Sequence, residues 1–361
     1  MFDYSKKVTN FHDIHVTLTM SLRRDMKSRR DANKKRIIDG LDILGKPSPI
    51  DWINQGGYAQ QTMTQPPEGD EDSRYDIDMG VVFDEADAKT PATTKRWVRD
   101  AIAEKASGMK NEPECKPKCV RVVYADGYQC DFPVFQKCSG LNDTHELASS
   151  DSWVASDPRS MNAWIDERVS SLSPECSGVS QLRQIIRLIK YFAKVKAFKK
   201  SRKFPSGLLV TALAIENYIA VEGRLDEAFR ETLRRISSRS KHQAVFANGI
   251  QISDNKDTER LSRMIESAVE SVEHLDNLHD DIDEETARKS WKKVFQHSYF
   301  DEVESKSASA TTNKYASAAA GALGISSSVQ AERAAAAVSG LKSSGTMSKP
   351  FAFDDESNDS Q

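Results

Sequence analysis

The chain has 361 residues, of which 38% are hydrophobic and 29% charged, with a formal net charge of −3. This length suits two domains or one large two-lobed unit. The net charge argues against a dedicated nucleic-acid coat protein, because binding to phosphate backbones needs a basic surplus. No apolar stretch approaches the ~20 residues of a membrane-spanning helix, and the first residues lack the apolar region of a signal peptide. We therefore expect a cytoplasmic protein without membrane contact.

The first part of the chain has helical character. Residues 8–44 place apolar side chains at helical spacing among many charges, which predicts a helix over this range. Its basic run from Arg23 to Arg36 is interrupted by Asp25 and Asp31. Such a run is typical of a solvated helix face, with nucleic-acid contact as the alternative.

Two aspartates lie two residues apart in a strand-like segment, Tyr75-Asp-Ile-Asp-Met-Gly-Val-Val-Phe83. Side chains at this spacing leave a strand on the same face, so Asp76 and Asp78 point the same way. The alternative is a charged strand edge that discourages aggregation. We favour a cation site, because the following Val-Val-Phe reads as a buried strand and buried carboxylates without a partner are costly.

A third carboxylate follows from a predicted hairpin. The runs 120–124 and 129–135 flank Asp126-Gly127, and Asp-Gly between β-rich runs is a strong hairpin signal. This hairpin would bring the strand of Asp131 beside the acidic pair. A cluster of three such carboxylates fits a pair of hard divalent cations about 3.5–4 Å apart, which supports in-line phosphoryl displacement. The pattern therefore predicts nucleotidyl transfer.

Several residues are candidates for holding phosphates. Gly56-Gly57, followed by Thr62, precedes the acidic strand. Most Gly-Gly pairs are turns, but at this place we favour a backbone cradle for β- and γ-phosphates. Ser206 follows Pro205 at an expected helix start, where its hydroxyl and the helix N-terminal amides can bind phosphate.

A basic stripe runs along the predicted helix 181–198. It comprises Arg183, Arg187, Lys190 and Lys194. For most of these side chains we expect a solvated helix face opposite the apolar one. Lys190 is the exception, as a point charge for a triphosphate.

After residue 305 the composition changes to Ala and Ser, with few large apolar groups to bury. We expect this tail to be disordered or transiently helical. Its end, residues 346–353, holds the tail's densest apolar cluster. A partner-binding peptide and an inert tail both remain open there.

Taken together, Gln55-Gly-Gly-Tyr-Ala-Gln-Gln-Thr62, Tyr75-Asp-Ile-Asp-Met-Gly80 and Tyr128-Gln-Cys-Asp-Phe-Pro133 resemble the polymerase-β-like nucleotidyltransferases, and more narrowly the bacterial CD-NTases. Leu188-Ile-Lys-Tyr-Phe192, Phe204-Pro-Ser-Gly-Leu208 and the segment 287–300 resemble the helical lobe of that family. The resemblance covers about residues 10–300.

The resemblance implies an α+β fold, a polymerase-β-like nucleotidyltransferase mixed sheet with an N-terminal helix and a C-terminal helical lobe. We expect four regions. They are an N-terminal helical segment packing across both lobes (1–48), the nucleotidyltransferase core (49–160), the helical lobe (161–304) and the tail (305–361).

By the same resemblance the chain would be a cyclic oligonucleotide synthase of CBASS anti-phage systems. Asp76 and Asp78 would hold two Mg²⁺ ions, with Mn²⁺ as a substitute, and Asp131 would join the ion that activates the attacking ribose hydroxyl. The nucleotide would be held by Gln55, Gly56, Gly57, Thr62, Lys190 and Ser206. The alternatives are transfer of a nucleotide to an RNA or protein acceptor, and an inactive nucleotide-binding module.

Two departures from the family pattern matter. The family often has Gly-Ser where this chain has Gly57, which leaves backbone contacts alone, and some animal relatives place a base-stacking aromatic at Gly207. Base selection therefore does not carry over. The expected partners are NTPs, with ATP among them, and a HORMA-type or other CBASS regulator bound through the tail. No stable nucleic-acid complex is expected, and a nucleic-acid activator is left open.

Overall fold

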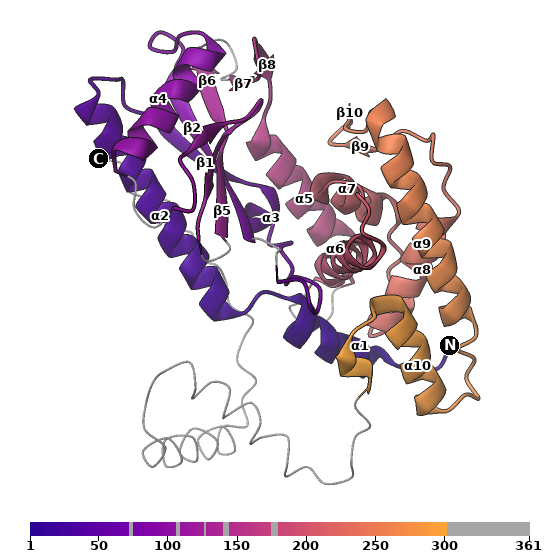
Figure 1. The fold of residues 1–361 in the computed structure, drawn as a ribbon. Coiled ribbons are helices and arrows are strands. Elements are labelled where there is room, and N and C mark those ends of the chain that lie inside the picture. The colour runs from indigo at the N-terminus through magenta and orange to yellow at the C-terminus, as the bar shows by residue number, and fades with distance from the viewer. Residues whose placement is uncertain (72–74, 106–108, 126–127, 140–143, 175–179, 302–361) are drawn as a thin grey trace, which may run out of the picture.

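The computed structural model describes residues 1–71, 75–105, 109–125, 128–139, 144–174 and 180–301. These residues form two lobes, one built on a sheet and one built of helices, which we call the sheet lobe and the helical lobe (Figure 1). The predicted α+β class is therefore confirmed.

The strand that carries the acidic pair, β2 (Tyr75–Asp84), lies inside an eight-stranded mixed sheet. It pairs antiparallel with β1 (Asp51–Gln55) and parallel with β5 (Tyr128–Phe132) and β6 (Val134–Cys138). Antiparallel strands extend the sheet beyond β5 and β6: β4 (Val120–Val123), β3 (Glu114–Cys115), β7 (Thr144–Ala148) and β8 (Trp153–Ala155). Strands β4 and β5 form the predicted hairpin; its residues 126–127 lie outside the described part.

Two helices cover one face of the sheet, namely α2 (Met20–Ile43) and α4 (Pro91–Glu104). The buried apolar side chains of β2, Ile77 and Met79 among them, belong to the same core cluster as residues of both helices. The helices approach so closely that a Cβ on Gly40 would lie 2.1 Å from the carbonyl oxygen of Ala101. This face is thus filled with core, and the aspartates point from the other face.

The helical lobe surrounds α6 (Gln181–Lys200), whose apolar side is almost fully buried. Around it lie α5 (Pro158–Leu172), α7 (Gly207–Asn217), α8 (Leu225–Ser237), α9 (Thr258–Asp276) and α10 (Glu284–Phe295), together with the hairpin β9 (Phe246–Ala247) and β10 (Ile250–Gln251) and the short 3-10 turns η2 (Asn255–Asp257) and η3 (Ser298–Asp301). Trp291, Phe295 and Phe300 are buried core residues. None of the described helices combines the length and the apolar character needed to cross a bilayer.

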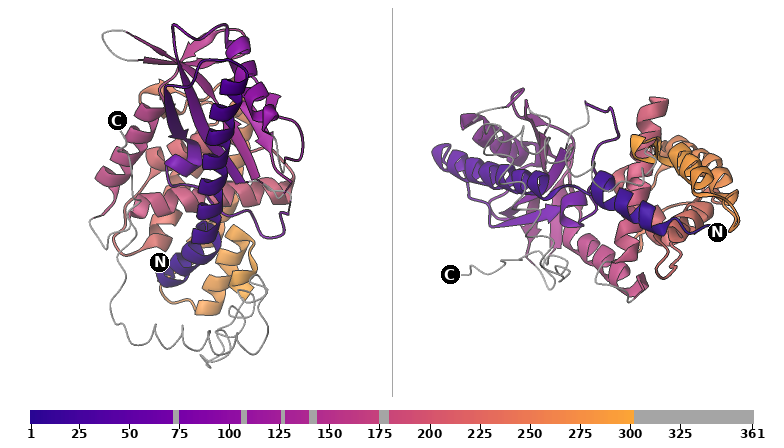
Figure 2. Two further views of the ribbon diagram at one scale, coloured as in Figure 1. Left: turned by 90° about the vertical axis from the view of Figure 1, so that its left-hand side faces the viewer. Right: turned by 90° about the horizontal axis from the view of Figure 1, so that it is seen from below.

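The prediction of one helix over residues 8–44 is wrong. The segment divides into α1 (Ser5–Phe11), a π-helical turn η1 (His12–Val16) and α2, which begins after the cap Thr19. The two helices bury their apolar faces in different places, α1 in the core of the helical lobe and α2 in the core of the sheet lobe. Figure 2 shows the chain passing from one lobe to the other at this break.

Phe11 packs the N-terminal segment against the core of the helical lobe. Its ring lies 4.8 Å from those of Phe295 and Phe300, and it is fully buried. We expect Phe11→Ala to lower the free energy of unfolding by about 3–5 kcal/mol in urea titrations, because it removes a large core side chain. The control Ile14→Ala, on a side chain that is 54% exposed, should change it by less than about 1 kcal/mol. Equal effects of the two substitutions would contradict the docking of α1.

Candidate active site

The parallel pairing of β2 with β5 brings three carboxylates together. Asp78 lies opposite Asp131 in the register of the two strands, and Asp76 leaves the same face of β2. Ligand oxygens of Asp76, Asp78 and Asp131 all lie within 4.8 Å of one another. This is the convergence on which the sequence-based site rests.

The carboxylates raise one another's proton affinity. Burial raises the pKa of Asp78 to about 8, and the negative charges of Asp76 and Asp131 add to the effect. Burial and Asp131 likewise raise the pKa of Asp76 to about 6. A cluster of carboxylate oxygens with too little positive charge around it suits a hard divalent cation.

Arg121 is a residue that the sequence reasoning missed. It lies on β4 directly opposite Asp131, and its Nε and Nη2 donate to the two carboxylate oxygens at 2.8 and 2.7 Å. This paired arrangement is a strong form of ion pair. It raises the pKa of Arg121, and the guanidinium in turn opposes the upward pKa shifts of Asp76 and Asp78.

The end of β1 closes over the carboxylates. Gln55 lies opposite Asp78, and Gly56 follows with φ +68°. A Cβ on Gly56 would lie 2.1 Å from Oδ2 of Asp78, so only glycine fits here. The side-chain nitrogen of Gln55 is buried without a hydrogen-bond partner in the described structure.

The other predicted phosphate residues gather around Lys190 on α6. Its Nζ donates to Oγ1 of Thr62 at 3.0 Å, and a Cβ on Gly57 would lie 3.3 Å from the same nitrogen. Ser206 caps α7, and a Cβ on the next residue, Gly207, would lie 3.7 Å from this amine. Burial, with help from neighbouring cations, lowers the pKa of Lys190 to about 7. Without an anion beside it, the charged form of this lysine is poorly stabilised.

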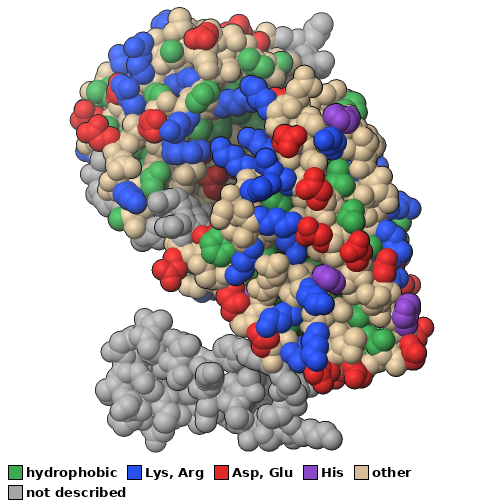
Figure 3. All heavy atoms as spheres, turned by 45° about the vertical axis from the view of Figure 1, so that its right-hand side comes forward, with side chains coloured by type: hydrophobic (Ala, Val, Ile, Leu, Met, Phe, Trp, Pro, Cys, Tyr) green, Lys and Arg blue, Asp and Glu red, His purple; other side chains and the backbone are tan. Residues whose placement is uncertain are grey.

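The expectation of a solvated basic stripe on this helix is wrong for its other three members. Arg183 and Arg187 donate to the backbone carbonyls of Gln60 and Gln61, and Lys194 donates to that of Thr64. The stripe therefore binds the loop that follows Gly56-Gly57 and links the two lobes. In Figure 3, Lys and Arg side chains line the hollow between the lobes. These hydrogen bonds supply donors to backbone carbonyls of the loop, which need partners when they are removed from water.

The sequence of the sheet lobe matches a known family of domains. Residues 50–135 match the family model for the nucleotidyltransferase domain of "Cyclic GMP-AMP synthase DncV-like" proteins. A curated relative from Escherichia albertii, named Cyclic GMP-AMP synthase, is 26% identical over 273 residues. The match covers 72% of this chain and spans only 58% of the length of that relative.

Solved structures share the fold. Vibrio cholerae DncV cyclic AMP-GMP synthase superposes with a TM-score of 0.64 at 14% identity, covering 82% of this chain and 96% of DncV. CdnC from E. coli MS115-1, solved with HORMA-deltaN, gives 0.63 at 17% identity over 82% and 98% of the two chains. The CD-NTase CdnG of Bradyrhizobium diazoefficiens, solved with GTP, gives 0.61 at 15% identity over 83% and 97%.

The solved structures establish the fold, and the family model and the curated relative identify the domain that carries the three aspartates. Residues 50–135 therefore form a DncV-like nucleotidyltransferase domain, in a chain with the fold of these solved structures.

Proposed function

We propose that this protein is a cyclic oligonucleotide synthase, which makes a cyclic di- or trinucleotide from NTPs, ATP among them, in bacterial anti-phage (CBASS) defence. The observation that carries the proposal is the meeting of Asp76, Asp78 and Asp131 beside the Gly56-Gly57 turn and Lys190. The name of the E. albertii relative and the GTP in the CdnG structure support this chemistry.

The carboxylate cluster suits Mg²⁺, with Mn²⁺ as a substitute. Asp76 and Asp78 would hold two ions, and Asp131 would join the one nearest the attacking hydroxyl. The fit rests on the number of oxygen ligands and on the raised pKa values of Asp76 and Asp78, which arise from burial and from the neighbouring carboxylates and show that the charged forms are poorly stabilised. When bound, such ions neutralise charge on the phosphates and favour the deprotonated hydroxyl.

The remaining residues position the triphosphate. Backbone amides of Gly56 and Gly57, the amine of Lys190 and the hydroxyl of Ser206 would contact its oxygens, whose charge stabilises the ammonium form of Lys190. A ribose hydroxyl then bonds to the α-phosphorus, the bond to pyrophosphate breaks, and the hydroxyl proton passes to solvent. Positioning and electrostatic stabilisation provide most of the rate enhancement. Repeated transfer followed by ring closure gives the cyclic product.

We also propose that a regulatory partner binds through the tail. CdnC, which shares the fold, was solved with a HORMA protein. The tail, residues 305–361, lies outside the described residues, so this proposal rests on its sequence and on that relative. Deleting residues 306–361 should abolish partner capture and leave basal synthesis intact; capture that survives the deletion would dispose of the idea.

The central test of the proposed function is product formation. Purified protein is incubated with labelled NTPs and Mg²⁺ or Mn²⁺, and the mixture is then treated with phosphatase. We expect a phosphatase-resistant product that the double variant Asp76→Asn/Asp78→Asn does not make, since that variant lacks both shared ligands. Glu85→Gln/Asp87→Asn removes two exposed carboxylates from the same lobe and serves as the control. Label that appears instead in an added RNA or in protein would favour transfer to a macromolecule, and turnover by the double variant would refute the site.

The metal-free site should also make stability depend on pH. The folded pKa of Asp78, about 8, lies above its ordinary value, so folded protein keeps a proton that the unfolded chain releases. This contribution to stability is present below pH ~4 and is lost as the pH rises through about 8. In EDTA, Asp78→Asn should therefore match wild type near pH 4 and exceed its melting temperature near pH 8.5. A difference that stays constant across this range would contradict the assignment.

A further inference from the structure

The helical lobe has an open cleft away from the carboxylates, between the C-terminal parts of α6, α9 and α10. Its volume is about 480 Å³, within the range of roughly 300–1,000 Å³ typical of ligand pockets. The side chains that the argument uses are Lys196, Lys199, Ser271, His274, Lys293 and Gln296. Polar and basic groups from three helices thus face one space.

The positive charge of this cleft is not balanced by acids. Its one glutamate, Glu270, accepts hydrogen bonds from Lys200 at 3.0 and 3.1 Å, and Lys292 pairs with Asp301. In the described part of the chain, no carboxylate lies within ion-pair distance of Lys196, Lys199 or Lys293.

Lys196 is the enclosed member of this group. It is 3% exposed, and its Nζ donates to the backbone carbonyl of Lys293 at 3.2 Å. Burial lowers the pKa of Lys196 to about 8, which means that the site stabilises its ammonium form poorly. An enclosed cation of this kind is stabilised by a bound anion.

Ser271 supplies a second, independent observation. Its side chain is 1% exposed, and within the described residues its hydroxyl has no hydrogen-bond partner. Buried polar groups without partners are rare, and each calls for an explanation. A ligand oxygen in the adjoining cleft would give this hydroxyl an acceptor.

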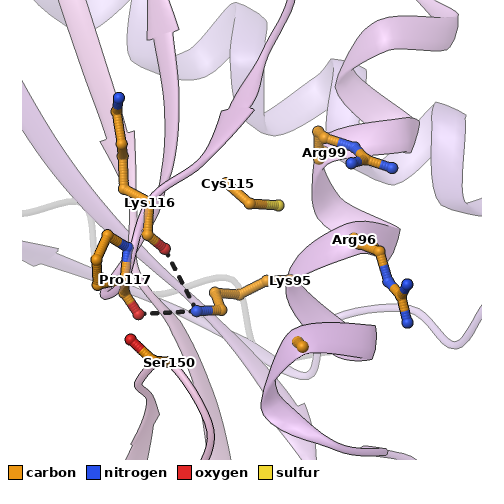
Figure 4. A pocket seen from close by; sticks show the side chains of 8 residues that line it. Lys95, Arg96, Arg99, Cys115, Lys116, Pro117 and Ser150 are labelled. Carbon is orange, nitrogen blue, oxygen red and sulfur yellow. Dashed lines mark hydrogen bonds between the residues drawn. The ribbon is translucent and has the colours of Figure 1, made fainter.

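A second basic cleft, on the sheet lobe, serves as a comparison, because its buried lysine has a full set of acceptors within the protein. There the Nζ of Lys95 donates to the carbonyls of Lys116 and Pro117, as Figure 4 shows, and also to that of Ser149. Arg99 in the same cleft pairs with Asp100. Lys95 thus has three carbonyl acceptors, whereas Lys196 has one. Among the described residues, Lys199 and Lys293 have no carboxylate partner.

We propose that the cleft between α6, α9 and α10 binds a condensed phosphate, such as pyrophosphate or tripolyphosphate. Several lysines at separate positions match a polyanion with more than one phosphate, because each ammonium acts as a compact point charge. The residues that line the cleft include no Phe, Tyr or Trp on which a base could stack, and His274 is their one aromatic ring. The phosphates, free or carried by a nucleotide, are therefore the recognised group. The site is independent of the proposed catalysis.

The test is calorimetric titration of the full chain with pyrophosphate, tripolyphosphate and ATP in EDTA, with sulfate as a reference anion. We expect saturable binding of tripolyphosphate that is at least tenfold weaker in Lys199→Gln/Lys293→Gln, whose side chains are exposed. Lys241→Gln/Lys256→Gln, exposed lysines of the same lobe outside the cleft, should bind like wild type. Ser271→Ala should also weaken binding without lowering the melting temperature.

Other outcomes would overturn the proposal. Binding that is lost in Lys190→Met and kept in the Lys199/Lys293 variant would place the anion in the active site. Much tighter binding of ATP than of tripolyphosphate would mean that a nucleoside is recognised. Binding of duplex DNA or RNA without binding of tripolyphosphate would mark a nucleic-acid surface, and absence of saturable binding would leave no site.

Discussion

The repulsion among three carboxylates on neighbouring strands is the constraint on which this structure depends. The parallel register of β2 and β5 sets Asp78 against Asp131, and Asp76 shares their face. The protein relieves the repulsion only in part, through the ion pair of Arg121 with Asp131. Burial, together with the repulsion that remains, keeps the pKa values of Asp76 and Asp78 raised. In the proposed function, metal binding, nucleotide binding and catalysis all depend on the negative charge of these carboxylates.

The rest of the molecule keeps this charge next to a cationic surface. Helix α6 presents Lys190 to the Gly56-Gly57 turn and binds the following loop through Arg183, Arg187 and Lys194. The N-terminal segment adds a second connection, since α1 packs in the helical lobe and α2 on the sheet. The lobes are therefore joined where the carboxylates of the sheet lobe lie near the basic side chains of α6. In the proposed function, the triphosphate and its cations would neutralise both groups.

The sequence predicted features whose signal is local. Alternation in β2 identified the acidic pair, and the Asp-Gly turn identified the hairpin of β4 and β5. Register was harder to predict. A two-residue turn at residues 126–127 would pair Arg121 with Phe132, whereas the structure pairs it with Asp131, so the ion pair was missed.

Contacts between residues far apart in the chain could not be predicted from the sequence either. The basic stripe on α6 has the spacing of a solvated face, and only the three-dimensional position of the loop at residues 60–64 shows what it binds. Likewise, the break between α1 and α2 arises because the two helices pack in different cores. The sequence between Phe11 and Met20 contains no Pro or Gly that would indicate a helix break.

Manganese binding followed by electron paramagnetic resonance tests the central claim most directly, because it reports cation occupancy without turnover. The account predicts saturable binding of Mn²⁺ to the wild-type protein and binding at least tenfold weaker to Asp131→Asn. Binding to Arg121→Met should be tighter than to wild type, because this substitution removes the competing guanidinium. Binding to Asp131→Asn as tight as to wild type would contradict the account, since the three carboxylates would then not form one cation site.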